Sequence, residues 1–310
     1  MVERGMNKIV IITRRTRLED MIRKYNTVGQ ARFFVEHMGM DFDDFVTEDE
    51  QYHRAVNTVK EAAEKLARVQ MIDREYLPNM IFGQNDICVV VGQDGLVANS
   101  MKYLDGQPLI GINPDVARFD GILLPYEAGD AEAVFKRVLA GRHGNREITM
   151  AEVTTRDGQS LLAVNDLFIG CSSHASARYR IEWESRKENQ SSSGIIVSTG
   201  LGATGWYKSV IEEAKAIAAY FGCGQIPYEP IKWNEKKLSF VVREPFESVS
   251  TQAGIVFGLI KEGEEIKIIS NMPTGGVIFS DGMEEDRIDF PAGNEAVIGI
   301  AGKTGRLVNG

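Results

Sequence analysis

The sequence has few cysteines, no long apolar run and no excess of positive charge, and each shortage excludes a class of protein. Its three cysteines, Cys88, Cys171 and Cys223, lack CxxC spacing, which argues against a disulfide framework and a structural zinc site. The longest apolar runs, such as ICVVVG, are too short to span a bilayer, and residues 1–15 contain no apolar h-region of a secretion signal. We therefore expect a cytoplasmic protein without a membrane partner.

The charge balance argues against nucleic acid as a partner. A formal net charge of −9 disfavours nonspecific binding to phosphate backbones, which needs a basic face that displaces counterions. The four histidines, His37, His53, His143 and His174, show no paired helical spacing, so each is interpreted as a solvated or core side chain. The 310 residues, 43% hydrophobic and 25% charged, suffice for two globular domains with substantial cores.

The most informative feature is a short apolar strand, residues 87–91, that runs directly into Gly-Gln-Asp-Gly at 92–95. Glycines let the backbone turn sharply and approach a ligand, and exposed N–H groups in such a turn can hold phosphate oxygens. The strand would place Asp94 at its carboxyl end, where α/β sheets bind ligands. The alternative is an ordinary strand-to-helix turn in which Asp94 caps a helix that starts at Leu96.

Further motifs follow in a fixed order. The pair Asn165-Asp166 lies within LLAVNDLFIG, residues 193–206 read SGIIVSTGLGATGW, and a Ser-Asp-Gly turn at Asp281 follows an apolar run. This order resembles the NAD kinase family, whose hallmarks are a Gly-Gly-Asp-Gly turn, an Asn-Glu or Asn-Asp pair, a Ser-Thr-Pro-Thr-Gly-Ser-Thr-Ala-Tyr segment and a late Asp-Gly turn. The resemblance spans roughly residues 86–300 and rests on the order of the motifs more than on any one of them.

The resemblance implies a role for each motif. Asp94 matches the family's essential aspartate, which implies that its carboxylate accepts the proton of the acceptor hydroxyl. Asn165 and Asp166 match the pair that contacts the substrate nucleoside, and residues 199–206 match the segment in which a hydroxyl and an aromatic ring hold adenine. The residues implied to bind substrate are Gly92, Gly95, Asn165, Asp166, Thr199, Thr204 and Trp206, with Gln93 and Asp281 as further candidates.

Some of these positions have a structural alternative, and several depart from the family pattern. Asn165-Asp166 could be a turn or bulge between strands, and Trp206 could pack in the core. Gln93 puts a side chain where ATP phosphates should approach. Ser192-Ser193-Gly194 replaces a Gly-Asp-Gly, so a substrate-contacting carboxylate is missing, and residues 207–221 replace the family's Ser-Ala-Gly-Gly-Pro continuation. These departures therefore weaken the inference about the substrate more than the inference about the fold.

The first half alternates between helix and strand patterns, which indicates an α/β nucleotide-binding domain with a parallel sheet, residues 1–147, carrying the Gly-Gln-Asp-Gly turn. An acidic loop is expected at 40–51, and the polar tract 141–147 is the best domain boundary. The expected strands are 8–13, 87–91, 108–112 and 121–124, and the expected helical segments are 15–39, 53–69 and 131–139.

From residue 148 short alternating strands indicate a β-rich substrate-binding domain of two packed sheets, residues 148–310, whose last segment is a candidate to return to the first domain. Residues 207–221 predict one helix, whose apolar stripe is attributed to core packing. The tract ENQSSSG, 188–194, is expected to be a flexible hairpin loop.

The resemblance implies an ATP-dependent kinase, with Mg²⁺ as cofactor, that phosphorylates the adenosine ribose 2'-hydroxyl of NAD to give NADP. Two alternatives remain: a kinase of the same superfamily acting on a sugar, nucleoside or lipid hydroxyl, and a nucleotide-sensing module without turnover. NAD or a related nucleotide and ATP are the expected partners, no protein side chain is singled out as a metal ligand, and a homo-oligomer is expected. Asp94, Asn165, Asp166 and Thr204 should converge on one interdomain cleft.

Overall fold

The computed structural model describes residues 8–309 and divides the chain into two units. Met1–Arg146 with Arg306–Gly310 form the first unit, and Glu147–Gly305 form the second. The segment 1–7, part of the region expected to carry no secretion signal, lies outside the described residues. Between residues 8 and 309, no helix is long and apolar enough to cross a membrane.

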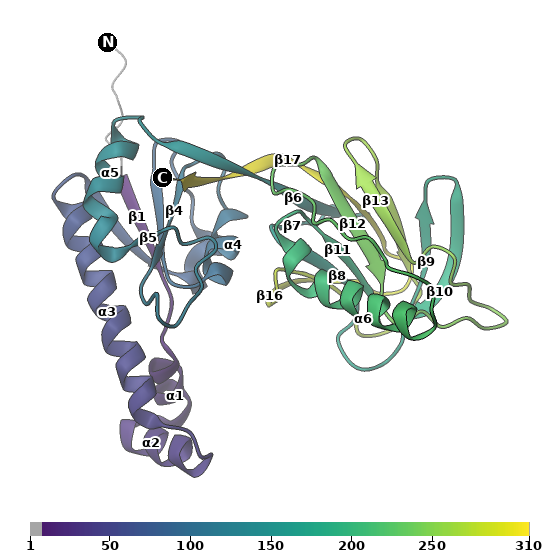
Figure 1. The fold of residues 1–310 in the computed structure, drawn as a ribbon, viewed down its shortest axis with the longest axis horizontal. Helices are drawn as coiled ribbons and strands as arrows, with labels where there is room; N and C mark the ends of the chain where they lie inside the picture. The colour runs from purple at the N-terminus through teal and green to yellow at the C-terminus, as the bar shows by residue number, and fades with distance from the viewer. Residues whose placement is uncertain (1–7, 310) are drawn as a thin grey trace. The chain divides into compact units, whose positions relative to one another are not determined.

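A parallel sheet forms the centre of the first unit (Figure 1). Its central strands, residues 8–13, 87–91 and 109–113, are buried and rich in valine and isoleucine, as expected when helices cover both faces of a parallel sheet. Past β4 (Leu109–Asn113) the sheet continues with the short β5 (Tyr126–Glu127) and with the end of β17 (Glu295–Asn309), where Leu307 pairs with Leu109. The central strands lie in the order β2 (Arg68–Asp73), β1 (Lys8–Thr13), β3 (Ile87–Val91) and β4 (Leu109–Asn113).

Helices cover both faces of this sheet. Ile9 and Ile11 point to one face and pack on Val56 and Val59, because alternate residues of a strand share a face. That face carries α3 (Phe42–Glu64) and α5 (Ala131–Leu139), which the one-turn η2 (Ala128–Asp130) precedes, whereas α4 (Asp94–Met101) and η1 (Arg74–Asn79) contact one another beside β3 and β4. The predicted α/β architecture is confirmed.

The helices between β1 and β2 differ from the prediction. The helical segment predicted at 15–39 is two helices, α1 (Arg17–Tyr25) and α2 (Val28–His37), because Asn26 adopts a left-handed φ of 65° and Thr27 caps α2. The predicted acidic loop at 40–51 is wrong. It is the first half of α3, which Asp41 caps and whose Phe42 and Phe45 pack against α1 and α2 (Figure 1).

Two further assignments in this unit are wrong. Residues 68–73 form β2 rather than the end of a helix, and residues 121–124 form a turn rather than a strand. This turn crosses β4 at Gly111, where an added Cβ would lie 2.1 Å from the carbonyl oxygen of Leu123. Gly111 is thus needed for the close approach of backbone to backbone.

The second unit contains two packed sheets, as predicted. Tyr179 and Phe240 come from different sheets and share one buried core. The first sheet contains β6 (Gly144–Thr155), β7 (Ser160–Ala163), β9 (Ala177–Trp183), β10 (Arg186–Ser192), β14 (Ile266–Ser270) and β17 (Glu295–Asn309). The second, fully antiparallel sheet has the order β13 (Phe257–Lys261), β12 (Lys237–Val242), β11 (Ile195–Ser198), β8 (Asp166–Cys171), β15 (Gly276–Ser280) and β16 (Met283–Asp289).

The polar tract 188–194 is not a loop, because most of it belongs to strand β10. Gln190, Ser191 and Ser192 of this tract are buried, and hydrogen bonds pair the polar groups of Gln190 and Ser192. The Tyr179 hydroxyl lies 2.8 Å from Ser192 Oγ and donates to Gln190 Oε1 at 3.2 Å, while Gln190 Nε2 donates to the Ile255 carbonyl at 3.0 Å. Polar residues are accepted inside a sheet when their groups are paired in this way.

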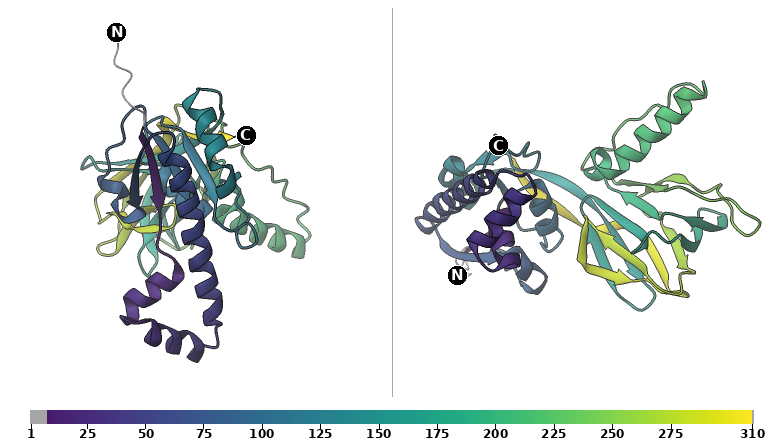
Figure 2. Two further views of the ribbon diagram at one scale, coloured as in Figure 1. Left: turned by 90° about the vertical axis from the view of Figure 1, so that its left-hand side faces the viewer. Right: turned by 90° about the horizontal axis from the view of Figure 1, so that it is seen from below.

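Helix α6 (Trp206–Tyr220) follows the one-turn η3 (Gly202–Thr204). The attribution of its whole apolar stripe to the core is wrong. Tyr207 and Ile211 are buried against the second sheet, whereas Ile217 is 53% exposed. The right-hand view of Figure 2 shows the helix leaving the sheets beyond its first turns.

We expect Gly111→Ala to destabilise the first unit, because the added methyl group meets the Leu123 carbonyl. A clash with backbone that cannot rotate away should cost about 1–3 kcal/mol or more in the free energy of unfolding. Urea unfolding measures this, with Gly129→Ala as control since nothing lies within 4 Å of that site. Equal urea midpoints for both variants would contradict the close approach.

Candidate functional site

The Gly-Gln-Asp-Gly turn joins the end of β3 to α4. The helix begins at Asp94, not at Leu96, and its N-cap is Gln93, whose side chain makes no capping hydrogen bond. Asp94 does not cap its own helix, because its Oδ1 accepts the backbone N–H of Leu123 at 2.7 Å. Gln93 and Gly95 are exposed. The turn thus presents the N–H groups of a helix N-terminus, a usual place for binding an anion, beside a half-buried carboxylate.

The loop that follows β4 is held from two sides. Asn113 Nδ2 donates to the Phe119 carbonyl at 3.0 Å, and Asn113 Oδ1 accepts the N–H of Asp115 at 3.0 Å. Asp94 holds the far end of the loop at Leu123. The Gly-Ile-Asn that ends β4 therefore fixes the loop beside Asp94.

Arg14, which sequence reasoning missed, lies behind the turn. Its side chain is 10% exposed, and its Nη2 pairs with Glu48 Oε1 at 3.0 Å. Its Nε has no hydrogen-bond partner among residues 8–309 and lies 3.9 Å from the place of a Cβ on Gly92. The arginine pair that directly follows the apolar strand 8–13 was the available signal.

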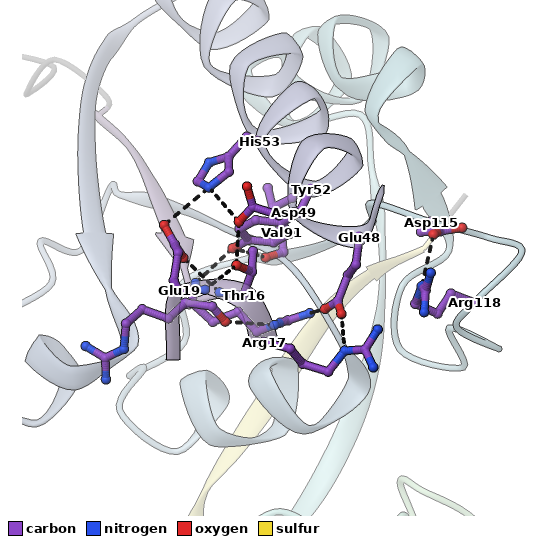
Figure 3. Close-up of polar contacts among 12 residues, drawn as sticks. Thr16, Arg17, Glu19, Glu48, Asp49, Tyr52, His53, Val91, Asp115 and Arg118 are labelled. Carbon is purple, nitrogen blue, oxygen red and sulfur yellow. Dashed lines mark hydrogen bonds and ion pairs between the residues drawn. The ribbon is translucent and has the colours of Figure 1, made fainter. Parts of the chain in front are cut away.

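Tyr52 connects Arg14 to the turn's strand. The Arg14 N–H donates to Tyr52 Oη at 2.8 Å, and the Tyr52 hydroxyl donates to the Val91 carbonyl at 3.1 Å (Figure 3). Burial raises the pKa of Tyr52 to about 12, so the phenol stays protonated at neutral pH. The ends of β1 and β3 are thus tied to α3 just before the turn.

In the second unit, the late Ser-Asp-Gly turn organises the Asn165-Asp166 pair. Asp281 adopts a left-handed φ of 54° between β15 and β16. Its carboxylate accepts the backbone N–H groups of Val164 at 3.1 Å, Asn165 at 2.6 Å and Asp166 at 3.3 Å. The N–H of Asp281 donates back to the Asp166 carbonyl at 3.0 Å. Asp281 therefore sets the backbone from which both side chains of the pair project.

Thr199 supports the same segment from the glycine-rich loop. Its hydroxyl donates to the Val164 carbonyl at 2.5 Å and accepts the N–H of Leu201 at 3.1 Å, and its own N–H donates to the Asn165 carbonyl at 2.9 Å. An added Cβ on Gly202 would lie 2.1 Å from that same Asn165 carbonyl. The buried Thr199 side chain thus serves the backbone of the loop and of the pair.

Asp166 is the most perturbed carboxyl of the second unit. It is 8% exposed. Burial and, secondarily, the negative charge of Asp281 raise the pKa of Asp166 to about 7. A carboxyl group that titrates near neutrality can either donate to or accept from a ligand hydroxyl.

Trp206 and Thr204 complete the candidate surface. Trp206 is half-buried and stacks on Phe168 with ring centroids 5.4 Å apart, while the Arg243 guanidinium lies 5.1 Å from its ring centre. Thr204 is exposed at the end of η3. Asn165, Asp166, Thr199 and Asp281 are brought together in the second unit, and Gly92, Gln93, Asp94 and Gly95 in the first. The convergence of the two groups stays a prediction.

A parallel α/β unit followed by a unit of two antiparallel-rich sheets is the fold of the NAD kinases. The structure is similar to yeast NADH kinase complexed with NADH (14% identity, 99% of this chain and 84% of that chain, TM-score 0.61). It is also similar to an NAD kinase from Archaeoglobus fulgidus in complex with ATP (16% identity, 98% and 94%, TM-score 0.58). Both likenesses concern the fold.

Sequence similarity points to the same group. The chain is 32% identical over 144 residues to the NAD kinase of Symbiobacterium thermophilum, covering 40% of this chain and 46% of the relative. It is 24% identical over 211 residues to a probable NADH kinase of Oryza sativa subsp. japonica, covering 63% and 62%. The chain thus spans less than two thirds of either relative's length, and no protein-family model matches it. Over the aligned residues, the chain is thus similar to kinases of NAD and NADH.

We expect Asp281→Asn to lower the free energy of unfolding by about 1–3 kcal/mol, because the amide keeps one acceptor but turns donors toward buried N–H groups. Asp289→Asn on the neighbouring strand is the control, since the Asp289 side chain is 85% exposed. Urea unfolding compares the two variants with the parent. Equal losses would mean that Asp281 does not organise the pair.

Asp166→Asn should change how stability depends on pH. Between about pH 4 and pH 7 the folded parent retains a proton on Asp166 that the unfolded chain has released, because the folded pKa is about 7 and the ordinary value 3.8. The parent therefore loses stability as pH rises through this window, and the variant lacks that loss. Relative to the parent, the variant should gain about 2–4 kcal/mol between pH 4 and pH 8. A pH-independent difference in urea unfolding would contradict the raised pKa.

Proposed function

We propose that the protein is a kinase that transfers the γ-phosphoryl group of ATP to the adenosine ribose 2'-hydroxyl of NAD, giving NADP. The observation that carries the proposal is the free carboxylate oxygen of Asp94 at the mouth of a glycine turn on this fold. While Oδ1 is engaged by Leu123, Oδ2 makes no hydrogen bond within residues 8–309. The relatives that the chain matches in sequence are named for kinase activity toward NAD or NADH, which supports the choice of reaction.

Asp94 acts as the general base. As the 2'-oxygen attacks the γ-phosphorus, the hydroxyl proton passes to Asp94 Oδ2 and the bond from phosphorus to the β-phosphate oxygen breaks, releasing ADP. The hydrogen bond from Leu123 holds the carboxylate in place. The protein supplies mainly position and a proton acceptor, which is what phosphoryl transfer requires.

The phosphates need positive charge around them. The N–H groups at the start of α4 face an anion bound at the turn, and the Arg14 guanidinium adds a cation behind Gly92. Mg²⁺ in such sites keeps several waters and binds largely through substrate phosphates, so it would be held by ATP beside the turn without using the Asp94 oxygen that accepts the proton. When bound with ATP, the ion would neutralise charge on the transferred group.

The acceptor nucleoside is assigned to the second unit. Asn165 and Asp166 would bind the ribose hydroxyls, because Asp281 and Thr199 fix their backbone while leaving both side chains to project. Thr204 and the Trp206 ring, stacked on Phe168, would contact the adenine. Thr199 and Asp281 thus act as positioning residues.

A nucleotide-sensing module without turnover is the second candidate. Gln93 favours it, since an exposed side chain stands in the turn where the family has glycine. We also propose a cytoplasmic homo-oligomer. Free Cys88, Cys171 and Cys223 are consistent with a reducing compartment, and exposed Phe257 and Leu259 on the sheet-edge strand β13 offer a surface to a second copy.

Asp94→Asn should lower the rate of ATP-dependent NADP formation by about 10²–10⁴-fold, because an amide cannot accept the proton. The melting temperature should hold, since the amide oxygen can still accept the Leu123 N–H. A coupled assay of NADP formation measures the rate, and Asp120→Asn in the same loop, exposed, is the control.

Full activity of Asp94→Asn would mean that another group is the base. If neither the parent nor the control forms NADP from NAD or NADPH from NADH, the assay is repeated with sugars, nucleosides and lipid alcohols. Nucleotide binding by calorimetry without turnover on any of these acceptors would favour the sensing module.

A further inference from the structure

Three side chains at the contact of α1 with α3 form a cluster that the proposed kinase reaction does not use. Glu19 lies in the first turn of α1, and Asp49 and His53 lie one turn apart on α3 (Figure 3). One ligand atom from each lies within 4.8 Å of the others, the only such group of three within residues 8–309. His53 Nε2 lies 3.3 Å from Glu19 Oε1 and 3.5 Å from Asp49 Oδ1.

These separations match the edges of a small coordination tetrahedron. Zinc binds nitrogen and oxygen ligands at about 2.0–2.2 Å, which for tetrahedral angles places neighbouring ligand atoms about 3.3–3.6 Å apart. The two edges that meet at His53 Nε2 fall in this range. Imidazole with carboxylates suits zinc and similar transition ions, whereas Mg²⁺ and Ca²⁺ take oxygen ligands.

The surrounding charges leave this cluster short of positive charge. Three nearby carboxylates have arginine partners: Glu48 has Arg14 and Arg17, Asp44 has Arg17 and Arg118, and Asp20 has Arg15. Within the described chain, the ion pairs of Glu19 and Asp49 are with His53 alone. The negative charges of Glu19 and Asp49 therefore have no arginine or lysine partner within the described chain, which favours a bound cation between them and the His53 imidazole.

The ligand atoms are held in place and remain accessible. The Thr16 N–H donates to Glu19 Oε2 at 2.8 Å, which leaves Oε1 free, and the Thr16 hydroxyl donates to Asp49 Oδ1 at 2.5 Å. Hydrogen bonds of this kind orient ligands in metal sites. The His53 side chain is 48% exposed and that of Asp49 22%, so water can reach a fourth position.

We propose that Glu19, Asp49 and His53 bind a divalent transition-metal ion, with Zn²⁺ as the best fit and water as the fourth ligand. The ion joins the start of α1 to α3. His53 follows Tyr52, which hydrogen-bonds both Arg14 and Val91, so the ion braces the helices that hold the ends of β1 and β3. The site is independent of the proposed kinase activity.

The test titrates ZnCl₂ into the full-length protein after chelator treatment and dialysis, with isothermal calorimetry as the readout. We expect one Zn²⁺ per chain and a rise in melting temperature with zinc. Loss of a ligand in His53→Ala should weaken binding about 100-fold or more, since even residues that only orient ligands contribute 10–100-fold. His37→Ala, exposed on α2, is the matched control and should bind as the parent does.

Cobalt provides a second readout that a plain ion pair would not give. Co²⁺ bound to the parent should show the intense visible bands of a tetrahedral site, and Glu19→Gln should lose them. If His53→Ala and His37→Ala bind zinc equally, or if the parent binds none, the proposal is overturned. If the cluster is only an ion pair, the parent should bind no zinc. His53→Gln should then lose the same stability in the presence and absence of zinc.

Discussion

Buried strands that end in sharp turns leave backbone N–H groups without partners, and the structure of both units depends on side chains that accept them. Asp281 accepts from Val164, Asn165 and Asp166, and Asp94 accepts from Leu123. An unpaired buried N–H group costs about 1–3 kcal/mol, so these acceptors are needed whatever the protein does. The motifs that resemble a kinase site are therefore also the motifs that close the turns.

Some residues of these motifs have their polar groups occupied by backbone hydrogen bonds, whereas others keep a polar group available to a ligand. The Thr199 hydroxyl and the Asp281 carboxylate are occupied by backbone groups. Asp94 keeps one oxygen free, and Asn165 and Thr204 are partly or fully exposed. Folding alone thus accounts for Thr199 and Asp281, whereas Asp94 Oδ2 has no hydrogen-bond partner among residues 8–309.

The sequence predicted correctly those elements that a local pattern of apolar residues determines. The predictions were wrong where contacts with residues distant in sequence determine the structure. Strand 87–91 and helix 131–139 have the predicted bounds, because each is apolar with the right period. The acidic tract 40–51 is helical because Asp41 caps it and Phe45 finds a core on α1 and α2. The candidate residues were identifiable from motif order, but Arg14 and the support by Asp281 depend on contacts between segments far apart in sequence.

Two carboxyl groups of the second unit, Asp166 and Asp281, lie close enough for the charge of Asp281 to affect the protonation of Asp166. Asp281 is surrounded by N–H donors, while the buried Asp166 meets its negative charge, so the two groups have unequal environments. With its pKa raised to about 7, Asp166 is divided between its neutral and ionised forms at neutral pH. A ribose hydroxyl both donates and accepts, so it can bind either form. If Asp166 binds the acceptor as proposed, an anionic acceptor would be repelled as Asp166 ionises, so the proposed site would favour neutral hydroxyls over charged groups.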